Sequence, residues 1–202
     1  MTKTVLVTHS LPGERIHELD RYCRLKQWTG PGLLSAAGLR RELAGCQGLV
    51  CLLTDRVDSA LLEAMPDLEF VSSMSVGVDH IDVAAMTARG IPVGNTPGVL
   101  VETTADAAFA LLLAAARRLG EAERFVRRGD WVAENAWSPD FFPGKDLNGA
   151  TRGSIGLGAI GRAGARRAAG CGMRGLAWNR SAVALAGVTA VRRAEWLRAS
   201  EG

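Results

Sequence analysis

The chain has 202 residues, of which 48% are hydrophobic, and this is enough to bury a core in one large domain or two small ones. No apolar run reaches the roughly 18 residues that a membrane span needs, and the N-terminus lacks the apolar core of a signal peptide, so we expect a cytoplasmic protein with no membrane partner. The net charge of +3 divides into +7 for residues 151–202 and −4 for residues 1–150, and we assign the basic excess to a solvated helix face rather than to a nucleic-acid site, because no aromatic residues are interleaved with the arginines.

The first hundred residues alternate between short apolar runs, typical of buried strands, and helical patterns. Strands are predicted at residues 4–8, 23–28, 48–53, 69–74 and 91–95, and helices lie between them at PGERIHELDRY, residues 35–43, SALLEAM and DVAAMTARG. Strand–helix alternation with short connections predicts an α/β fold, with a parallel sheet covered on both faces. Ligands of such sheets bind at the carboxyl ends of the strands.

The pattern changes near residue 100. The run VETTADAAFALLLAAARRL predicts one long helix, so apolar along its centre that we expect it to be buried on most sides. A charged helix follows, and then a loop-like aromatic segment at 131–149. Strand–helix alternation restarts with SIGLG and continues through a helix from about Ala159 to the strand GLAWN. The sequence therefore divides into domains at 1–99 and 150–202, joined by a segment at 100–149.

The stretch GSIGLGAIGRAG, residues 153–164, contains a glycine pattern typical of dinucleotide-binding loops. It leaves a predicted strand and opens a predicted helix, as such a loop must. Gly156 would permit the tight turn, Gly158 would let a pyrophosphate approach the backbone, and Gly161 would let helix and strand pack closely. The alternative is a glycine turn with a purely structural role.

The end of the next strand indicates which dinucleotide would fit. NAD sites usually place Asp or Glu there, whereas this chain has Asn179, Arg180 and Ser181, and residues 151–202 contain no Asp. Arginine and serine would hold a 2′-phosphate through hydrogen bonds. NADP(H) is therefore the preferred cofactor and NAD(H) the second choice, unless Arg180 is only a solvated turn residue.

An earlier loop, SVGVDH at residues 75–80, also follows a predicted strand and precedes a predicted helix. The backbone amides of Val76 and Gly77 could point at an anion there, and Gly77 would leave the approach unobstructed. Alone this is an ordinary turn, but with a nucleotide motif downstream it becomes a candidate carboxylate site.

Several segments in order resemble the D-isomer-specific 2-hydroxyacid dehydrogenases, across residues 3–200. They are SMSVGVDHID, RGIPVGNTPGVLVETTADAAFALLLAAARR, GKDLNGAT and IGLGAIG, and GLVCLLTDRVD adds a similarity to the glyoxylate/hydroxypyruvate reductases of that family. The resemblance implies a flavodoxin-like substrate domain followed by the start of a Rossmann domain.

The resemblance also implies roles for particular residues. Val76 and Gly77 would bind the substrate carboxylate, and Leu53 would line the pocket. Thr104 would contact the cofactor near its nicotinamide, residues 158–160 (Gly158, Ala159 and Ile160) would cover the pyrophosphate, and residues 179–181 would take the adenosine ribose and its phosphate. Residues 100–149 would form a homodimer, with Trp137 reaching the partner's active site.

The family's catalytic arginine, histidine and acidic residue would follow the second Rossmann strand, beyond this chain, so we assign no catalytic residue here. The histidines are His9, His17 and His80, and of these only His80 adjoins the substrate loop, which it could orient. We expect two strands of the Rossmann sheet, with AEWLRASEG as the helix before a third. The scattered cysteines, at 23, 46, 51 and 171, predict neither a metal site nor disulfides.

The function expected from the resemblance is NADPH-linked reduction of a small 2-oxo acid, such as glyoxylate or hydroxypyruvate, to the D-2-hydroxy acid. Residues 1–202 by themselves are expected to show little or no turnover. The alternative is an inactive fragment that serves as a ligand-binding or dimerisation module. A methyltransferase that uses the glycine loop is disfavoured by the substrate-domain motifs upstream.

Overall fold

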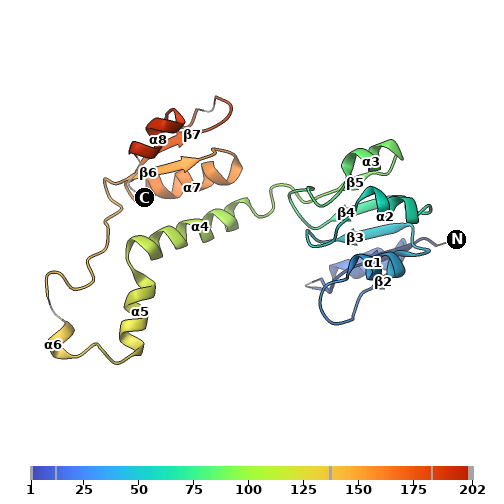
Figure 1. Cartoon of the computed structure of the whole chain (residues 1–202), viewed down its shortest axis with the longest axis horizontal. Coiled ribbons are helices and arrows are strands. Elements are labelled where there is room, and N and C mark those ends of the chain that lie inside the picture. Colours follow the sequence, from blue (N-terminus) through green and yellow to red (C-terminus); the bar gives the residue numbers. More distant parts are fainter. Residues whose placement is uncertain (1, 12, 137, 183, 200–202) are drawn as a thin grey trace. The chain divides into compact units, whose positions relative to one another are not determined.

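The computed structural model describes residues 2–11, 13–136, 138–182 and 184–199 (Figure 1). Two compact units divide the chain, unit 1 at Met1–Val99 and unit 2 at Leu100–Gly202. None of the helices among the described residues combines the length and the hydropathy that a bilayer crossing requires.

Unit 1 contains a five-stranded sheet in which every pair of neighbouring strands is parallel. The strands, in the order β2-β1-β3-β4-β5, are Arg24–Gln27, Thr4–Val7, Gly48–Cys51, Phe70–Ser73 and Val93–Gly94. Because the strands are parallel, their carboxyl ends lie along one edge of the sheet. The predicted α/β fold is confirmed, and the loops after β3, β4 and β5 lie at that edge.

The helices of unit 1 connect these strands, and the α-helices among them begin at polar caps. They are η1 (Arg15–Arg21), α1 (Ala36–Leu43), α2 (Ser59–Ala64) and α3 (Val83–Ala88). Ser35, Asp58 and Asp82 each accept a hydrogen bond from a backbone amide of the first turn of the helix that follows. The segment η1 is instead a 3-10 helix, which has neither a side-chain cap nor a buried residue.

The core of unit 1 explains why these strands could be predicted from the sequence. In β1 the consecutive residues Val5, Leu6 and Val7 are all buried, which requires cover on both faces of the sheet. A Cβ at Gly48 in β3 would lie 2.2 Å from the ring of Phe70 in the neighbouring strand, so a larger residue at this position would have to displace that ring. Gly48 lies opposite Phe70 and Cys51 opposite Ser73, so β3 and β4 end side by side and their carboxyl-end loops begin next to each other.

Unit 2 begins with helices and continues with a second parallel sheet. The helices are α4 (Val101–Ala116), α5 (Leu119–Arg127), α6 (Ala133–Ala136), α7 (Ala159–Gly170) and α8 (Arg193–Ala199). The strands, in the order β6-β7-β8, are Thr151–Ile155, Arg174–Trp178 and Val188–Ala190.

Two expectations for unit 2 are wrong. The sheet has a third strand, β8, because Val188 pairs with Gly175 of β7, and α8 follows this strand instead of preceding it. Helix α4 is also less buried than its apolar sequence predicts, since Ala105 is its one buried residue and Leu111 is 72% exposed. In the single chain α4 packs against α7 and α5, and these contacts leave much of its apolar surface open.

Candidate functional site

The loop after β4 has three successive backbone carbonyls held by partners. The Ser75 carbonyl accepts from the Thr96 amide (2.9 Å), the Val76 carbonyl from Asn95 Nδ2 (2.8 Å), and the Gly77 carbonyl from Ser75 Oγ (2.7 Å). In a trans peptide the N–H points opposite to the C=O, so the amides of Val76 and Gly77 point away from these partners. Neither amide donates a hydrogen bond within the described part of the chain, so both are available to an anion.

Behind this loop lies a chain of side-chain hydrogen bonds that the sequence did not predict. Ser73 Oγ lies 2.7 Å from Ser75 Oγ and 2.9 Å from His80 Nε2. Ser73 is fully buried and Ser75 is 8% exposed, so water does not compete strongly for these hydrogen bonds. The structure therefore connects His80 to the carboxylate loop (residues 75–78), as the sequence suggested, but through two serines.

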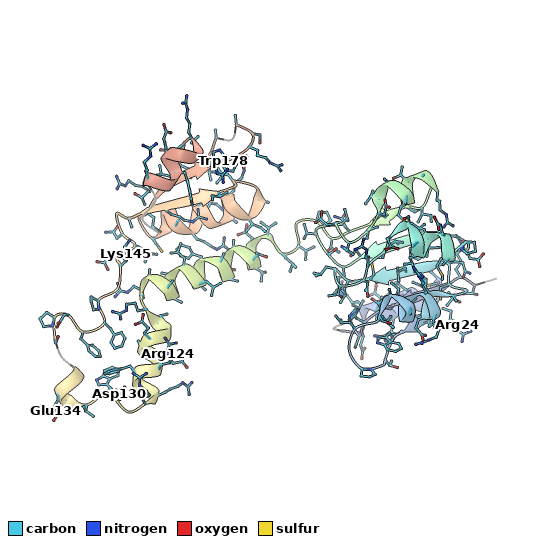
Figure 2. All side chains as sticks on the ribbon, viewed as in Figure 1. Arg24, Arg124, Asp130, Glu134, Lys145 and Trp178 are labelled. Atoms are coloured by element: carbon cyan, nitrogen blue, oxygen red, sulfur yellow. The ribbon has the colours of Figure 1, made fainter. Side chains whose placement is uncertain are left out.

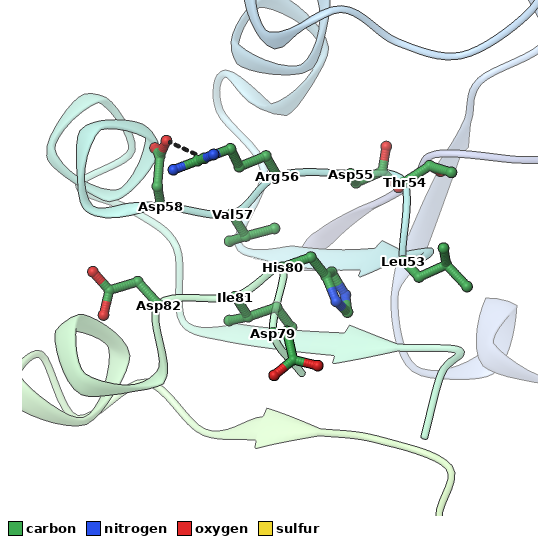
Figure 3. Close-up of a pocket in the computed structure, with 10 residues that line it drawn as sticks. All are labelled: Leu53, Thr54, Asp55, Arg56, Val57, Asp58, Asp79, His80, Ile81 and Asp82. Atoms are coloured by element: carbon green, nitrogen blue, oxygen red, sulfur yellow. Dashed lines mark hydrogen bonds and ion pairs between the residues drawn. The ribbon is translucent and has the colours of Figure 1, made fainter. Parts of the chain in front are cut away.

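A pocket of about 330 Å³ with a mixed polar and apolar lining lies beside the loop, where residues 53–58 after β3 meet residues 79–82 before α3 (Figure 3). Leu53 and His80 both line it. Two of its carboxylates already have structural roles, because Asp58 and Asp82 cap helices, and Arg56 pairs with Asp58 at 3.2 Å. The pocket therefore combines polar side chains, several of them already engaged, with the apolar side chains of Leu53, Val57 and Ile81, of which only Leu53 is exposed.

The segment that carries Leu53 is fixed by a buried carboxylate. Asp55 is 3% exposed, and its Oδ2 accepts from Thr8 Oγ1 (2.5 Å) and from the Leu52 amide (2.9 Å). His9 Nδ1 lies 3.8 Å from the same oxygen. Sequence reasoning missed Asp55, although a carboxylate directly after a buried strand was a signal that could have been used.

In unit 2 the glycine loop connects β6 to α7, and the structure of the chain itself explains why two positions of this loop are glycine. Gly156 adopts a positive φ of 90°, and a Cβ at Gly161 would lie 2.6 Å from the Gly156 carbonyl oxygen. A Cβ at Gly158 would meet nothing within 4 Å, so no contact within the described part of the chain requires glycine there. Gly158, Ala159 and Ile160 are exposed at the start of the 12-residue α7, where first-turn amides have no helical partner.

The end of β7 lies against this loop. The Gly156 amide donates to the carbonyl of Trp178, the last residue of β7 (2.8 Å; Trp178 is labelled in Figure 2). Asn179 Oδ1 accepts from the Leu157 amide at 3.1 Å, and Asn179 Nδ2 donates to the carbonyl (3.0 Å) and the hydroxyl (3.2 Å) of Ser181. The structure therefore brings residues 179–181 together with the glycine loop, but the Asn179 amide is already engaged within the protein.

Comparison with known proteins identifies the family. Residues 5–194 match the model of the catalytic domain of the D-isomer specific 2-hydroxyacid dehydrogenases. The chain belongs to this family. The resemblance seen in the sequence is therefore confirmed.

Similar dehydrogenases extend beyond this chain. It is 47% identical over 174 residues to a glyoxylate reductase of Korarchaeum cryptofilum, covering 86% of this chain and 52% of the relative. It is 44% identical over 166 residues to the human glyoxylate reductase/hydroxypyruvate reductase, covering 81% and 50%. The chain spans about half the length of these curated relatives.

Solved structures of other proteins have a similar fold. A protein from Thermus thermophilus matches with a TM-score of 0.91 and 39% identity, covering 98% of this chain and 62% of that one. An NADPH-dependent glyoxylate/hydroxypyruvate reductase from Sinorhizobium meliloti matches with a TM-score of 0.77 and 33% identity, covering 94% and 58%.

For two further predicted site residues, Thr104 and Trp137, the described contacts do not show a connection to either loop. Thr104 is exposed in the first turn of α4, and none of the described hydrogen bonds joins its side chain to the glycine loop. Trp137 lies outside the described residues.

Within the described ranges no cluster of three or more His, Cys, Asp or Glu side chains could hold a metal ion. The four cysteines are free thiols.

Proposed function

We propose that this chain carries the substrate loop and the pyrophosphate loop of a reductase that converts glyoxylate or hydroxypyruvate to the D-2-hydroxy acid with NADPH. The observation that carries the proposal is the pair of unengaged amides, Val76 and Gly77, at the carboxyl end of β4. The relatives called glyoxylate reductase support the choice of substrate.

Each loop has one chemical task in this proposal. The amides of Val76 and Gly77 bind the substrate carboxylate, and Leu53 contacts the rest of the substrate. A bound NADPH supplies the hydride for the carbonyl carbon. The first-turn amides of α7 would hold the pyrophosphate, which the positive end of the helix dipole favours, and Thr104 would contact the cofactor near its nicotinamide.

The preference for NADPH over NADH rests on the turn after β7. Arg180 is exposed and forms no ion pair with any described residue, so its guanidinium is available to a 2′-phosphate. Asn179 holds Ser181 beside the glycine loop, where its hydroxyl adds a second donor. A carboxylate at this turn would instead accept from ribose hydroxyls and repel the phosphate.

We further propose that residues 100–149 form a homodimer. Several large apolar side chains of this segment are exposed in the single chain, namely Leu111, Leu119, Val126, Trp131 and Val132. Exposed apolar surface of this extent is typical of a protein–protein interface. Size measurement in solution tests this point, since a monomer at all concentrations would contradict it.

The substrate proposal is tested by NMR with uniformly ¹⁵N-labelled protein. Addition of glyoxylate should shift the amide signals of Val76 and Gly77 more than those of the other loops of unit 1. If these two signals stay fixed at saturating glyoxylate, the carboxylate site is wrong. Because residues 1–202 contain no assigned catalytic trio, we expect binding with little turnover, and rapid NADPH oxidation by the pure chain with hydroxypyruvate would contradict that part.

The cofactor proposal is tested by calorimetric titration with NADPH and NADH. The Arg180→Ala variant should weaken NADPH binding by about tenfold or more, because a charge-assisted hydrogen bond is lost, and should leave NADH binding unchanged. Arg174→Ala, which removes an exposed arginine at the start of β7, is the matched control. Equal losses for both dinucleotides would refute the 2′-phosphate role.

A further inference from the structure

The peptide groups on both sides of Gly77 are each held by a side chain. Asn95 Nδ2 donates to the Val76 carbonyl at 2.8 Å, and Ser75 Oγ donates to the Gly77 carbonyl at 2.7 Å. Glycine has the widest choice of backbone conformations, and a Cβ at Gly77 would meet only Asp79 Oδ2, at 3.3 Å. Hydrogen bonds, rather than steric limits, therefore hold this part of the loop.

Ser75, Ser73 and His80 form a chain of hydrogen bonds, here called the relay. The hydrogen bond from Ser75 to Gly77 determines which group donates and which accepts at each step of this relay. A carbonyl can only accept, so the single hydroxyl proton of Ser75 goes to Gly77, and Ser75 Oγ accepts from Ser73. Ser73 has then used its own proton and must accept from His80 Nε2. The geometry thus requires the proton of the neutral His80 ring to lie on Nε2.

We propose that Asn95 and the relay His80–Ser73–Ser75 are positioning residues that orient the amides of the carboxylate loop before a ligand arrives. Asn95 holds the peptide whose N–H belongs to Gly77, and Ser75 holds the next peptide and so sets how the chain leaves Gly77. The identity of the ligand rests on the proposed function, but the relay itself can be examined without a ligand.

Loss of the hydrogen bond from Asn95 or of the one from Ser75 should lower the affinity for a carboxylate, although neither side chain touches the carboxylate. A freed Gly77 peptide must be ordered when the ligand binds, and this ordering reduces the net binding free energy. Asn95→Ala and Ser75→Ala should each weaken glyoxylate binding by about tenfold, the loss typical of one hydrogen bond. NADPH affinity should not change, because the glycine loop belongs to unit 2.

The relay predicts a rescue that a general packing role would not produce. His80→Phe keeps an aromatic ring but lacks the donor, so it should weaken glyoxylate binding, whereas the side-chain amide of His80→Gln can still donate to Ser73 and should restore most of the affinity. Ser72→Ala, which removes a hydroxyl on β4 outside the relay, is the matched control and should bind as the unmodified protein does. Equal affinities of the Phe and Gln variants would overturn the positioning role of His80.

A ligand-free measurement separates this proposal from the proposed function. The ¹⁵N shifts of the neutral His80 ring should show a protonated Nε2 and an unprotonated Nδ1. In Ser75→Ala, Ser73 is free to donate to His80, so the tautomer protonated at Nδ1 should become populated. A predominantly Nδ1-protonated ring in the unmodified protein would overturn the relay. Val76 and Gly77 amides that ignore glyoxylate would instead overturn the proposed function, and the ring shifts would still decide the relay.

Discussion

Asn179, directly after β7, accepts a hydrogen bond from the backbone amide of Leu157 in the glycine loop, with 3.1 Å between the amide nitrogen and Oδ1. The nitrogen of the same side chain donates to Ser181. One amide group therefore sets the spacing between the loop proposed to bind pyrophosphate and the turn proposed to bind the 2′-phosphate. The sequence presented Asn179 as a ribose contact, and the structure adds this bracing role.

Substitution of Asn179 by Asp should change cofactor preference more than it changes stability. A carboxylate can still accept from Leu157, but it cannot donate to Ser181, and its charge repels a 2′-phosphate. We expect the ratio of NADPH to NADH affinity to fall by about tenfold or more. Calorimetric titration with both dinucleotides measures this ratio, and Asn179→Ala, which removes the brace without adding charge, should weaken both. An unchanged ratio in Asn179→Asp would count against a 2′-phosphate at this turn, and unchanged affinities in Asn179→Ala would count against the bracing role.

Arg167 should contribute to the thermal stability of unit 2 in a salt-dependent manner. It connects α7 to α4 through Glu102 (2.9 Å) and Asp106 (2.5 Å), and its hydrogen bonds, first to Asp106 and then to Glu102, raise the pKa of its guanidinium. Arg167→Ala should lower the melting temperature at low ionic strength, and the difference should shrink in molar salt. Arg166 also pairs with Glu102, but its side chain is 60% exposed against 20% for Arg167, so Arg166→Ala should have a smaller effect.

The guanidinium of Arg152, in β6, is partly buried without an ion pair to any other described residue. Burial lowers the pKa of its guanidinium, and no ion pair with another described residue compensates. Arg152→Leu should therefore stabilise the protein by at most about 1 kcal/mol, since solvent screens a half-buried charge, because a charge without an ion pair is replaced by an apolar side chain on a strand. Urea denaturation measures the change, with the exposed Arg174→Leu as control. A destabilised Arg152→Leu would show that the guanidinium has a favourable partner.

Cys51 should make the stability of the protein fall in alkaline solution. Burial raises the pKa of its thiol from 9.0 to about 11. The thiol therefore stays neutral in the folded state while it ionises in the unfolded state, and its contribution, complete below pH 9, is lost as the pH rises toward 11. The expected slope is about 1.4 kcal/mol per pH unit in that window. Cys51→Ala should show a shallower decline than the unmodified protein in denaturation curves between pH 8 and 11.

The parts of the structure that the sequence predicted are those with a local cause. Strand β1 is apolar at consecutive positions because both faces of the sheet are covered. The glycine loop can be recognised in the sequence because the positive φ of Gly156 favours glycine and because a Cβ at Gly161 would clash with the Gly156 carbonyl oxygen. The missed parts depend on distant contacts. Strand β8 has only three residues, and the Asn95–Val76 and Thr8–Asp55 hydrogen bonds join residues 19 and 47 positions apart. No periodicity in the sequence reports such pairs.

The supports of the two proposed binding loops lie in different units. Ser73, His80 and Asn95 hold the carboxylate loop from within residues 1–99, whereas Asn179 braces the glycine loop from within residues 100–202. A substitution that alters dinucleotide choice therefore leaves every support of the carboxylate loop in place. A chimaera joined after Val99 should combine the acid preference of one parent with the dinucleotide preference of the other, so the two specificities can be inherited separately.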